Sequence, residues 1–464
     1  TDPSLLPFAT ANQRNASATN DAARMIGSRM RCGGAVGRRA PGAVRAAGRS
    51  TPAAPVTKTA PGQQQLQRRA PRTLAYVDAA AGGGGSLDGL VDYECELFTD
   101  RDGNMIQPMC TDFGFRSGAG RLYMERYGET PGSVFELAAS NFDKELTQMR
   151  QYTRFNHVIG PPVKPPSGMV SKAFSAAGGA LTSALGRLDL ALENAKVLPK
   201  LDAPERRIGT DSGEWAVMLD KLGQLTLDNQ AVVNMEKKRV EKEGELNTPF
   251  VVKAPFLALC WVLDVLYDGK PIQKFWVLET VARIPYFAYI SILHLYESLG
   301  FWRAGAELRK VHFAEEWNEM HHLQIMESLG GDQSWFDRFV AEHSAIAYYW
   351  LLIVFYLASP KVAYNFMQRV ELHAMDTYAE FVEENRELLK TIPPPRVALN
   401  YYLNEDLYLF DEFQTNSVEQ RRPSCNNLLD VFTNIRDDEN EHVKTMDACQ
   451  KETIVKAMAA KQGK

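Results

Sequence analysis

The chain has 464 residues, of which 45% are hydrophobic and 23% are charged. This length and composition allow a sizeable core and exclude both a wholly disordered chain and a polytopic transporter. Its 52 basic and 57 acidic residues give a net charge of −5, which argues against nucleic acid as a partner because such proteins usually carry a strong basic excess. The six cysteines form no C-x-x-C pair, so neither a zinc knuckle nor a disulfide framework is predicted.

The N-terminal segment has the composition of an organelle targeting peptide. From Ala22 to Val77 there is no Asp or Glu, whereas Arg and Lys occur eleven times. Transit peptides are rich in Arg and Ser and poor in acidic residues. A disordered basic tail is the alternative interpretation. We therefore predict that residues 1–75 are a transit peptide or disordered leader that takes no part in the fold.

Residues 76–249 follow as an N-terminal extension with linkers, in which we find no chemical motif. Aromatic residues and turn signals between 90 and 160 predict a small α/β or irregular segment. The Pro-rich stretch 161–166 and the Ala/Gly-rich stretch 176–186 predict spacers, and the charge-dense run 235–246 predicts a solvated helix. The sequence assigns no function to this extension.

Two apolar stretches raise the question of a membrane. Residues 254–263 are apolar, and residues 344–360 contain no charge over seventeen residues. A bilayer-spanning helix needs about 20 apolar residues, which neither stretch supplies. The second stretch is rich in Tyr, Trp and Phe, whose rings favour the headgroup boundary. We predict a pair of interfacial, monotopic helices, with buried core helices or a true span as alternatives.

Two histidines have a glutamate three residues before them, namely His322 with Glu319 and His442 with Glu439. Residues three apart share one face of a helix. The second pair continues an apolar stripe that begins at Leu428. Because burying carboxylates costs several kcal/mol unless they are paired or coordinate a metal, these faces predict a metal site.

Two single glutamates complete the pattern. Glu279 stands in an otherwise apolar helical stretch over 275–282, and Glu371 lies on an apolar stripe with Met367 and Phe381. Dinuclear sites in helical bundles take an E-x-x-H motif from each of two helices and one Glu from each of two others. Four carboxylates match two divalent ions, and mixed carboxylate and imidazole ligands suit iron or manganese, with redox work favouring iron.

Two further glutamates, Glu297 and Glu315, lie near these motifs but complete no second half of a site. We expect them beside the site or on the surface. Surface contacts between Glu and His on amphipathic helices are the alternative to a metal site.

The motifs around these residues resemble those of the alternative oxidase family, and specifically its plastid branch. The resemblance runs from about residue 250 to 450, and an insertion over 401–423, between the third and fourth ligand helices, is typical of the plastid branch. The extension matches nothing that we can name. The stretches that carry the resemblance are 278–287, 312–323 and 435–442.

The resemblance implies two non-haem iron ions as cofactors and a role for ten residues. It implies Tyr378 as a redox-active tyrosine near the irons and Thr377 as a residue of the quinol pocket. It also implies that Asn318 and Asp438 orient the histidines, as metal-bound imidazoles usually require. The implied iron ligands, the same six that spacing selects, are Glu279, Glu319, His322, Glu371, Glu439 and His442.

The expected fold is mainly α: a four-helix di-iron carboxylate bundle over residues 250–450 with additional interfacial membrane helices, followed by a C-terminal tail over 451–464. The resemblance implies a plastid terminal oxidase, which oxidises plastoquinol and reduces O₂ to water without pumping protons. It would act at the thylakoid membrane of the chloroplast, bound to the stromal face, and a homodimer is left open. A di-iron quinone hydroxylase and a non-enzymatic iron-binding bundle are the alternatives.

Overall fold

Helices make up most of the structure that can be described. The computed structural model describes residues 98–100, 102–109, 113, 132–156, 160–203, 213–302, 305–404 and 423–461, all of which fall in one unit, Asp88–Lys464. The predicted leader lies outside the described residues. The mainly α fold expected from the sequence is confirmed.

Two short antiparallel strands, β1 (Phe98–Thr99) and β2 (Met105–Ile106), precede the helices. The helices before the bundle are α1 (Val134–Phe155), α2 (Met169–Asn194), α3 (Gly213–Gln224) and α4 (Asn229–Glu243). Those of the bundle are α5 (Phe250–Leu266), α6 (Pro271–Ala282), α7 (Ile284–Ser298), α8 (Ala306–Ser328), α9 (Trp335–Ala358), α10 (Pro360–Leu389) and α13 (Leu428–Cys449). The remaining elements are α11 (Arg396–Leu399), a π-helical turn (Asn400–Asn404) and α14 (Glu452–Lys461).

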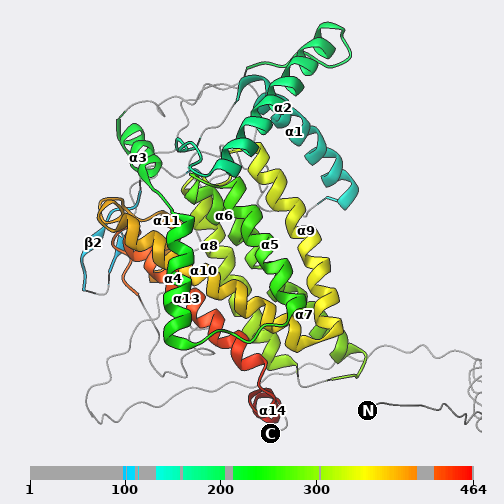
Figure 1. Cartoon of the computed structure of the whole chain (residues 1–464), viewed down its shortest axis with the longest axis vertical. Coiled ribbons are helices and arrows are strands. Elements are labelled where there is room, and N and C mark those ends of the chain that lie inside the picture. The colour runs from blue at the N-terminus through cyan, green and yellow to red at the C-terminus, as the bar shows by residue number, and fades with distance from the viewer. Residues whose placement is uncertain are drawn as a thin grey trace, which may run out of the picture. The chain divides into compact units, whose positions relative to one another are not determined.

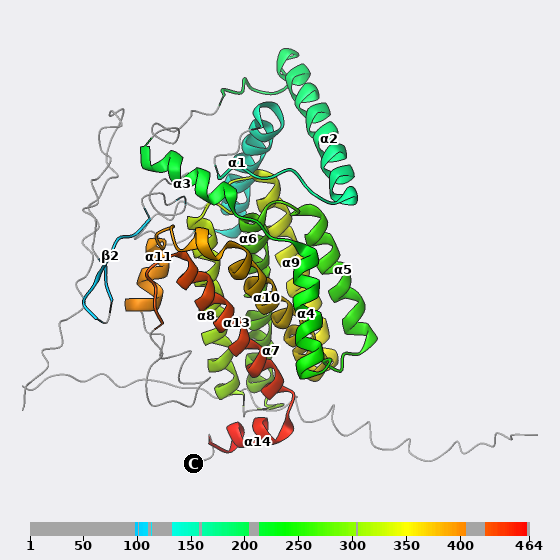
Figure 2. The same ribbon diagram turned by 60° about the vertical axis from the view of Figure 1, so that its left-hand side comes forward.

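Four of these helices, α6, α8, α10 and α13, carry the predicted ligands. Figures 1 and 2 show them side by side, with α10 packed along α13 and α6 packed against α8. One hydrophobic cluster lies around Phe275, Phe381 and Phe432, and a second lies around Tyr289 and Met367. The ligand helices therefore hold polar side chains inside an otherwise apolar core.

The ends of the ligand helices follow from local sequence. Helix α10 begins after Ser359, whose hydroxyl accepts a hydrogen bond from the amide of Val362. The side chain of Asn427 caps α13 by accepting from the amide of Asp430 at 3.0 Å. Beyond the end of α8, Gly330 adopts a φ of +87°, which glycine tolerates and other residues rarely adopt. Helix α8 therefore ends just before a glycine that can adopt this conformation.

The extension is more helical than the sequence predicted. The Ala/Gly-rich stretch 176–186, expected as a spacer, lies inside α2, so that expectation was wrong. The stretch contains no proline, and alanine is the strongest helix former. Packing adds stability, because α2 lies against α1 and Asp189 pairs with the buried Arg150 at 2.6 Å. The charged helix expected at 235–246 is largely present as α4.

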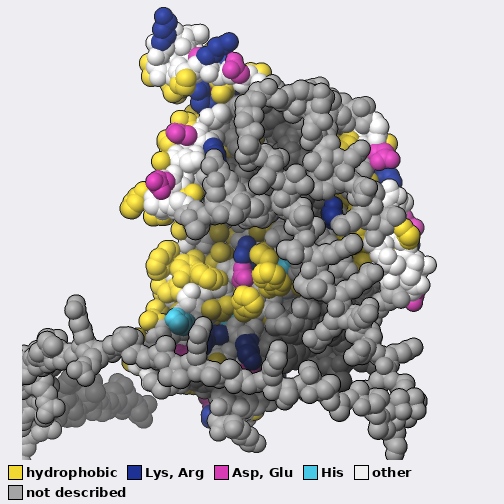
Figure 3. All heavy atoms as spheres, turned by 180° about the vertical axis from the view of Figure 1, so that it is seen from behind, with side chains coloured by type: hydrophobic (Ala, Val, Ile, Leu, Met, Phe, Trp, Pro, Cys, Tyr) yellow, Lys and Arg dark blue, Asp and Glu magenta, His cyan; other side chains and the backbone are white. Residues whose placement is uncertain are grey.

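The two apolar stretches lie in α5 and α9. Helix α9 exposes a stripe of Ile346, Trp350, Val354 and Leu357, and Figure 3 shows hydrophobic side chains gathered on one face of the molecule. Among the described helices, α9 alone is long and apolar enough to cross a membrane. A core helix of a soluble protein can meet the same criterion of length and composition, but such a helix is mostly buried, whereas only 17% of the apolar window of α9 is buried.

Candidate metal centre

The six residues selected from the sequence lie together in the core of the bundle. Each is at most 2% exposed. They form two overlapping groups within which one possible ligand atom per residue lies within 4.8 Å of the others. The first group is Glu279, Glu319, His322 and Glu439, and the second is Glu319, Glu371, Glu439 and His442.

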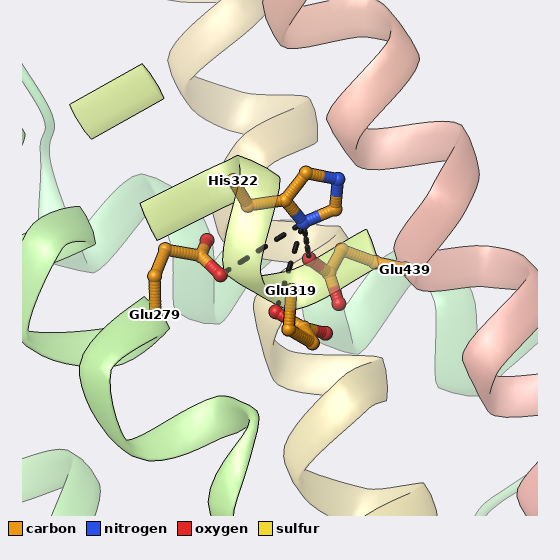
Figure 4. Close-up of side chains that lie close together, drawn as sticks. All are labelled: Glu279, Glu319, His322 and Glu439. Carbon is orange, nitrogen blue, oxygen red and sulfur yellow. Dashed lines mark ion pairs between the residues drawn. The ribbon is translucent and has the colours of Figure 1, made fainter. Parts of the chain in front are cut away.

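The first group converges on one nitrogen of His322. Its Nδ1 lies 3.8 Å from Oε2 of Glu279 and 3.6 Å from Oε2 of Glu319. The same nitrogen lies 3.3 Å from Oε1 of Glu439. Figure 4 shows the three carboxylates, from α6, α8 and α13, directed at this nitrogen. Three carboxylates thus surround a single imidazole nitrogen.

The second group is built in the same way around His442. Its Nδ1 lies 2.9 Å from Oε1 of Glu319 and 3.5 Å from Oε2 of Glu439. Oε2 of Glu371 lies 3.9 Å away. Glu319 and Glu439 therefore each present one oxygen to each histidine, which places their carboxylates between the two halves, as bridging ligands would lie.

Several polar atoms of this cluster are buried without a hydrogen bond. They include both carboxylate oxygens of Glu319, Oε2 of Glu279 and Nδ1 of His322. Buried polar atoms are almost always satisfied, and a desolvated carboxylate without a partner is costly. A cation among these atoms removes the cost, and the set of oxygen and imidazole donors suits a divalent transition metal. The residues present therefore fit a dinuclear metal centre.

The electrostatics of the cluster agree with this fit. Burial raises the pKa of Glu279 and of Glu371 well above the usual range, and repulsion from neighbouring carboxylates raises both further. Burial also opposes ionisation of Glu319, but the nearby imidazoles of His322 and His442 lower the pKa of its carboxyl overall. Four carboxylates at this separation need additional positive charge before all can ionise.

The Asp438 carboxylate, for which the resemblance implied a role in orienting the histidines, contacts the first histidine. Its Oδ2 lies 3.2 Å from Nε2 of His322 and accepts hydrogen bonds from Nδ2 of Asn318 at 3.1 Å and from the hydroxyl of Tyr402 at 3.0 Å. When Nε2 donates a hydrogen bond to this carboxylate, the lone pair of Nδ1 is directed at the cluster. Asn318 reaches no metal-site histidine in these contacts and acts on Asp438 instead.

Tyr378 and Thr377 lie next to the centre on α10. The buried phenol of Tyr378 donates to Oε1 of Glu279, and its ring stacks on Phe275 with centroids 4.2 Å apart. The Thr377 hydroxyl is buried and donates to the carbonyl of His373 at 2.6 Å. Tyr378 is therefore in contact with a predicted ligand, whereas a role for Thr377 in quinol binding stays a prediction.

Sequence reasoning missed Tyr286, at the start of α7. Its fully buried phenol donates to Oε1 of Glu371 at 2.6 Å. The residue lies inside one of the stretches that carry the family resemblance, yet no spacing rule connects it to a glutamate 85 positions away. The available signal in the sequence was that Tyr286 follows a helix break and lies only a few positions after the predicted ligand Glu279.

The two additional glutamates differ in position. Glu315 is buried, and its Oε2 lies 2.9 Å from Nδ1 of His312. Glu297 pairs with Arg309 near the surface end of α7. Glu315 thus lies beside the centre and Glu297 at the surface, which matches the two positions expected for them.

The fold and this cluster define a class of protein: a helical bundle whose core holds carboxylates and histidines arranged to bind metal. Residues 255–451 match the family model described as "Alternative oxidase". That stretch of the chain is therefore similar to an alternative oxidase domain.

Individual proteins show the same relationship. The chain is 56% identical over 190 residues to "Ubiquinol oxidase 4, chloroplastic/chromoplastic" of Arabidopsis thaliana, which covers 41% of this chain and 54% of that protein. It is 28% identical over 180 residues to "Ubiquinol oxidase 2, mitochondrial" of Glycine max, which covers 39% of this chain and 48% of that protein. The chain thus spans about half the length of these curated relatives.

Proposed function

We propose that this protein is a plastid terminal oxidase, which oxidises plastoquinol and reduces O₂ to water at a non-haem di-iron centre. The observation that carries the proposal is the pair of overlapping ligand groups that share Glu319 and Glu439. The match to the alternative oxidase family supports quinol and O₂ as substrates. Similarity to a chloroplastic/chromoplastic ubiquinol oxidase supports a plastid location, and plastoquinol is the quinol we propose there.

Two iron ions held by the six residues would supply the redox chemistry, in which four electrons from two quinols reduce one O₂ to two waters. The protein itself orients the ligand side chains and excludes water from them. Asp438 fixes the tautomer and orientation of His322. The phenol of Tyr378 holds a proton at its oxygen beside Glu279, where we propose that it takes part in electron delivery. Complete burial of the ligands keeps bulk water away from them.

We also propose that the enzyme docks on the stromal face of the thylakoid membrane as an interfacial, monotopic protein. Helix α5 exposes Leu257 and Trp261, and α9 exposes the stripe that includes Ile346, Trp350 and Val354. Exposed apolar surface of this extent is typical of protein or membrane interaction sites. Such a face would receive a lipid-soluble quinol from the bilayer. We propose that the enzyme does not pump protons.

Oxygen uptake by the protein in liposomes that contain plastoquinol tests the proposal. We expect quinol-dependent uptake in the wild type and uptake at background level in Glu279→Ala and His442→Ala, because each change removes a proposed ligand. Glu383→Ala, an exposed glutamate on α10, is the matched control and keeps wild-type uptake. Undiminished uptake in both ligand variants overturns the site assignment.

The same preparation separates the alternatives. Recovery of a hydroxylated quinone in place of the simple quinone identifies a di-iron quinone hydroxylase. A metal content far above two irons per chain identifies an iron-storage bundle. The proposed oxidase gives unmodified quinone, water and about two irons per chain, as its two ligand groups require.

A further inference from the structure

A cavity of about 570 Å³ lies where the ends of α7, α8, α9, α10 and α13 meet α14. Aromatic side chains form much of its wall, namely Tyr296, Trp302, Tyr356 and Tyr364, and Lys361 and Lys456 are among its polar lining residues. Ligand sites typically enclose about 300–1,000 Å³ and are lined mostly by apolar and aromatic side chains with a few polar groups. The cavity therefore has the size and lining of a ligand site.

A series of buried hydrogen bonds leads from the wall of this cavity into the core. The hydroxyls of Tyr356 and Tyr364 lie 3.1 Å apart, and the Tyr364 hydroxyl lies 3.0 Å from Nε2 of His312. Nδ1 of His312 lies 2.9 Å from Oε2 of Glu315. All four side chains are at most 3% exposed. Glu315 precedes Glu319 by one helical turn, so the series ends beside the proposed metal centre.

Glu315, the last side chain of the series, has one carboxylate oxygen that can accept a further hydrogen bond. Oε1 of Glu315 is buried and accepts no hydrogen bond. Burying four polar side chains in an otherwise apolar cluster costs free energy. If the series served only to satisfy the hydrogen bonds of His312, fewer polar side chains would be enough. The arrangement is explained if the polar series serves a ligand in the cavity whose chemistry is coupled to the centre.

The position of Tyr364 on α10 gives a second, geometric argument. Tyr364 and Tyr378 lie seven residues before and seven residues after Glu371, which is about 10 Å in each direction along the helix. Tyr378 contacts Glu279 next to Thr377, the residue predicted for quinol binding. Tyr364 lines the cavity at the other end. The proposed metal centre is thus flanked by a tyrosine on each side.

We propose that this cavity is a second binding site for a quinol or its quinone product, separate from the one predicted at Thr377. A substituted ring would stack against the aromatic wall, and its hydroxyl or carbonyl oxygen would hydrogen-bond with the hydroxyls of Tyr356 and Tyr364. The inference rests on the proposed function, since reduction of one O₂ requires two quinols. Two sites allow two rings to be bound at once.

A pair of neighbouring substitutions on α14 tests the site. Val455 lines the cavity, whereas the adjacent Ile454 is 38% exposed and does not. Equilibrium binding of radiolabelled oxidised decylplastoquinone to the metal-loaded protein is the measurement. We expect two molecules per chain for the wild type and for Ile454→Trp, and one for Val455→Trp, because the indole fills the cavity. Unchanged binding in Val455→Trp overturns the proposal.

Removal of one hydroxyl gives an independent readout. Tyr364→Phe keeps the aromatic wall but removes a hydrogen-bonding group, so we expect about threefold to tenfold weaker binding at one of two sites, with the other unchanged. Equal affinities for the wild type and Tyr364→Phe contradict the proposed contact with the ring.

The binding measurement uses the oxidised quinone and needs no turnover, so it separates this inference from the proposed function. Two bound rings in a protein that consumes no oxygen leave the cavity site standing and overturn the oxidase. Oxygen consumption by a protein that binds a single ring, with no effect of Val455→Trp on binding, supports the oxidase and overturns the second site.

Discussion

The two halves of the candidate metal centre are built from the same kinds of side chain, three carboxylates and one imidazole each, but differ in the contacts that support them. In each half a tyrosine from another helix donates to the single glutamate: Tyr378 to Glu279 in the first half and Tyr286 to Glu371 in the second. In the first half His322 also contacts Asp438. That aspartate belongs to α13, the helix that supplies the E-x-x-H motif of the second half.

This difference shows how the halves depend on one another. Asp438 precedes the shared ligand Glu439 in the sequence, and it accepts hydrogen bonds from Asn318 on α8 and from Tyr402. The first half is therefore tied to α13 both through the predicted ligand Glu439 and through the contact between Asp438 and His322. Changes to shared residues should affect both metals, and changes to a single support should affect one.

The largest expected effect comes from a shared ligand. Glu439→Ala removes a carboxylate that lies between both histidines, whereas Glu371→Ala removes one that belongs to the second group alone. We expect Glu439→Ala to bind less than half an equivalent of metal and Glu371→Ala to retain about one of the two expected in a site of this kind. Metal analysis after dialysis measures both. Equal loss in the two variants contradicts the shared position of Glu439.

Removal of metal should lower thermal stability. The cluster holds four buried carboxylates whose mutual repulsion is relieved by cations. A ligand at 100 times its Kd stabilises the native state by about 2.7 kcal/mol, which corresponds to roughly 5–10 °C in Tm for a domain of this size. Calorimetry with and without a chelator, followed by re-addition of Fe²⁺, checks this. A Tm that is insensitive to the chelator argues that the carboxylates are stable without metal.

A smaller effect is expected when the support of the first half is weakened. Asp438→Asn keeps the shape of the side chain but removes the charge that we propose orients His322, so we expect about tenfold weaker metal binding at that half. Asp437→Asn is the matched control, because Asp437 is half-exposed and pairs with Arg436. Titration with Co²⁺, followed by its visible absorption, resolves the two sites. Equal Co²⁺ affinities in Asp438→Asn and Asp437→Asn contradict a specific role of Asp438 in the first half.

The smallest effect is expected at the tyrosine of the second half. Tyr286→Phe removes one hydrogen bond to Glu371, for which we expect about twofold to tenfold weaker binding of the second metal. Tyr289→Phe, on the same helix, removes a buried hydroxyl that donates to the carbonyl of Ala363 and serves as the control for lost stability. If Tyr286→Phe weakens the first metal instead, the assignment of Tyr286 to the second half is wrong.

Local periodicity made the E-x-x-H motifs recognisable from sequence. Glu319 with His322 and Glu439 with His442 share a helical face whatever the helix packs against. Glu279 and Glu371 were recognisable because each interrupts an apolar stripe. The extension was less predictable, since the Ala/Gly-rich stretch became helical within α2, where packing against α1 outweighs the cost of its glycines.

The amino-acid sequence by itself determined which six side chains gather in the core, because a helix repeats every 3.6 residues and a carboxylate on an apolar face needs a partner there. Only the tertiary structure decided how they are arranged. It placed Glu319 and Glu439 between the two histidines, Tyr286 against Glu371 and Tyr364 against His312. The contacts between different helices join residues 52 to 123 positions apart. The position of the shared glutamates also depends on which carboxylate oxygen faces which imidazole. Helix packing sets such pairings, and no local spacing encodes them.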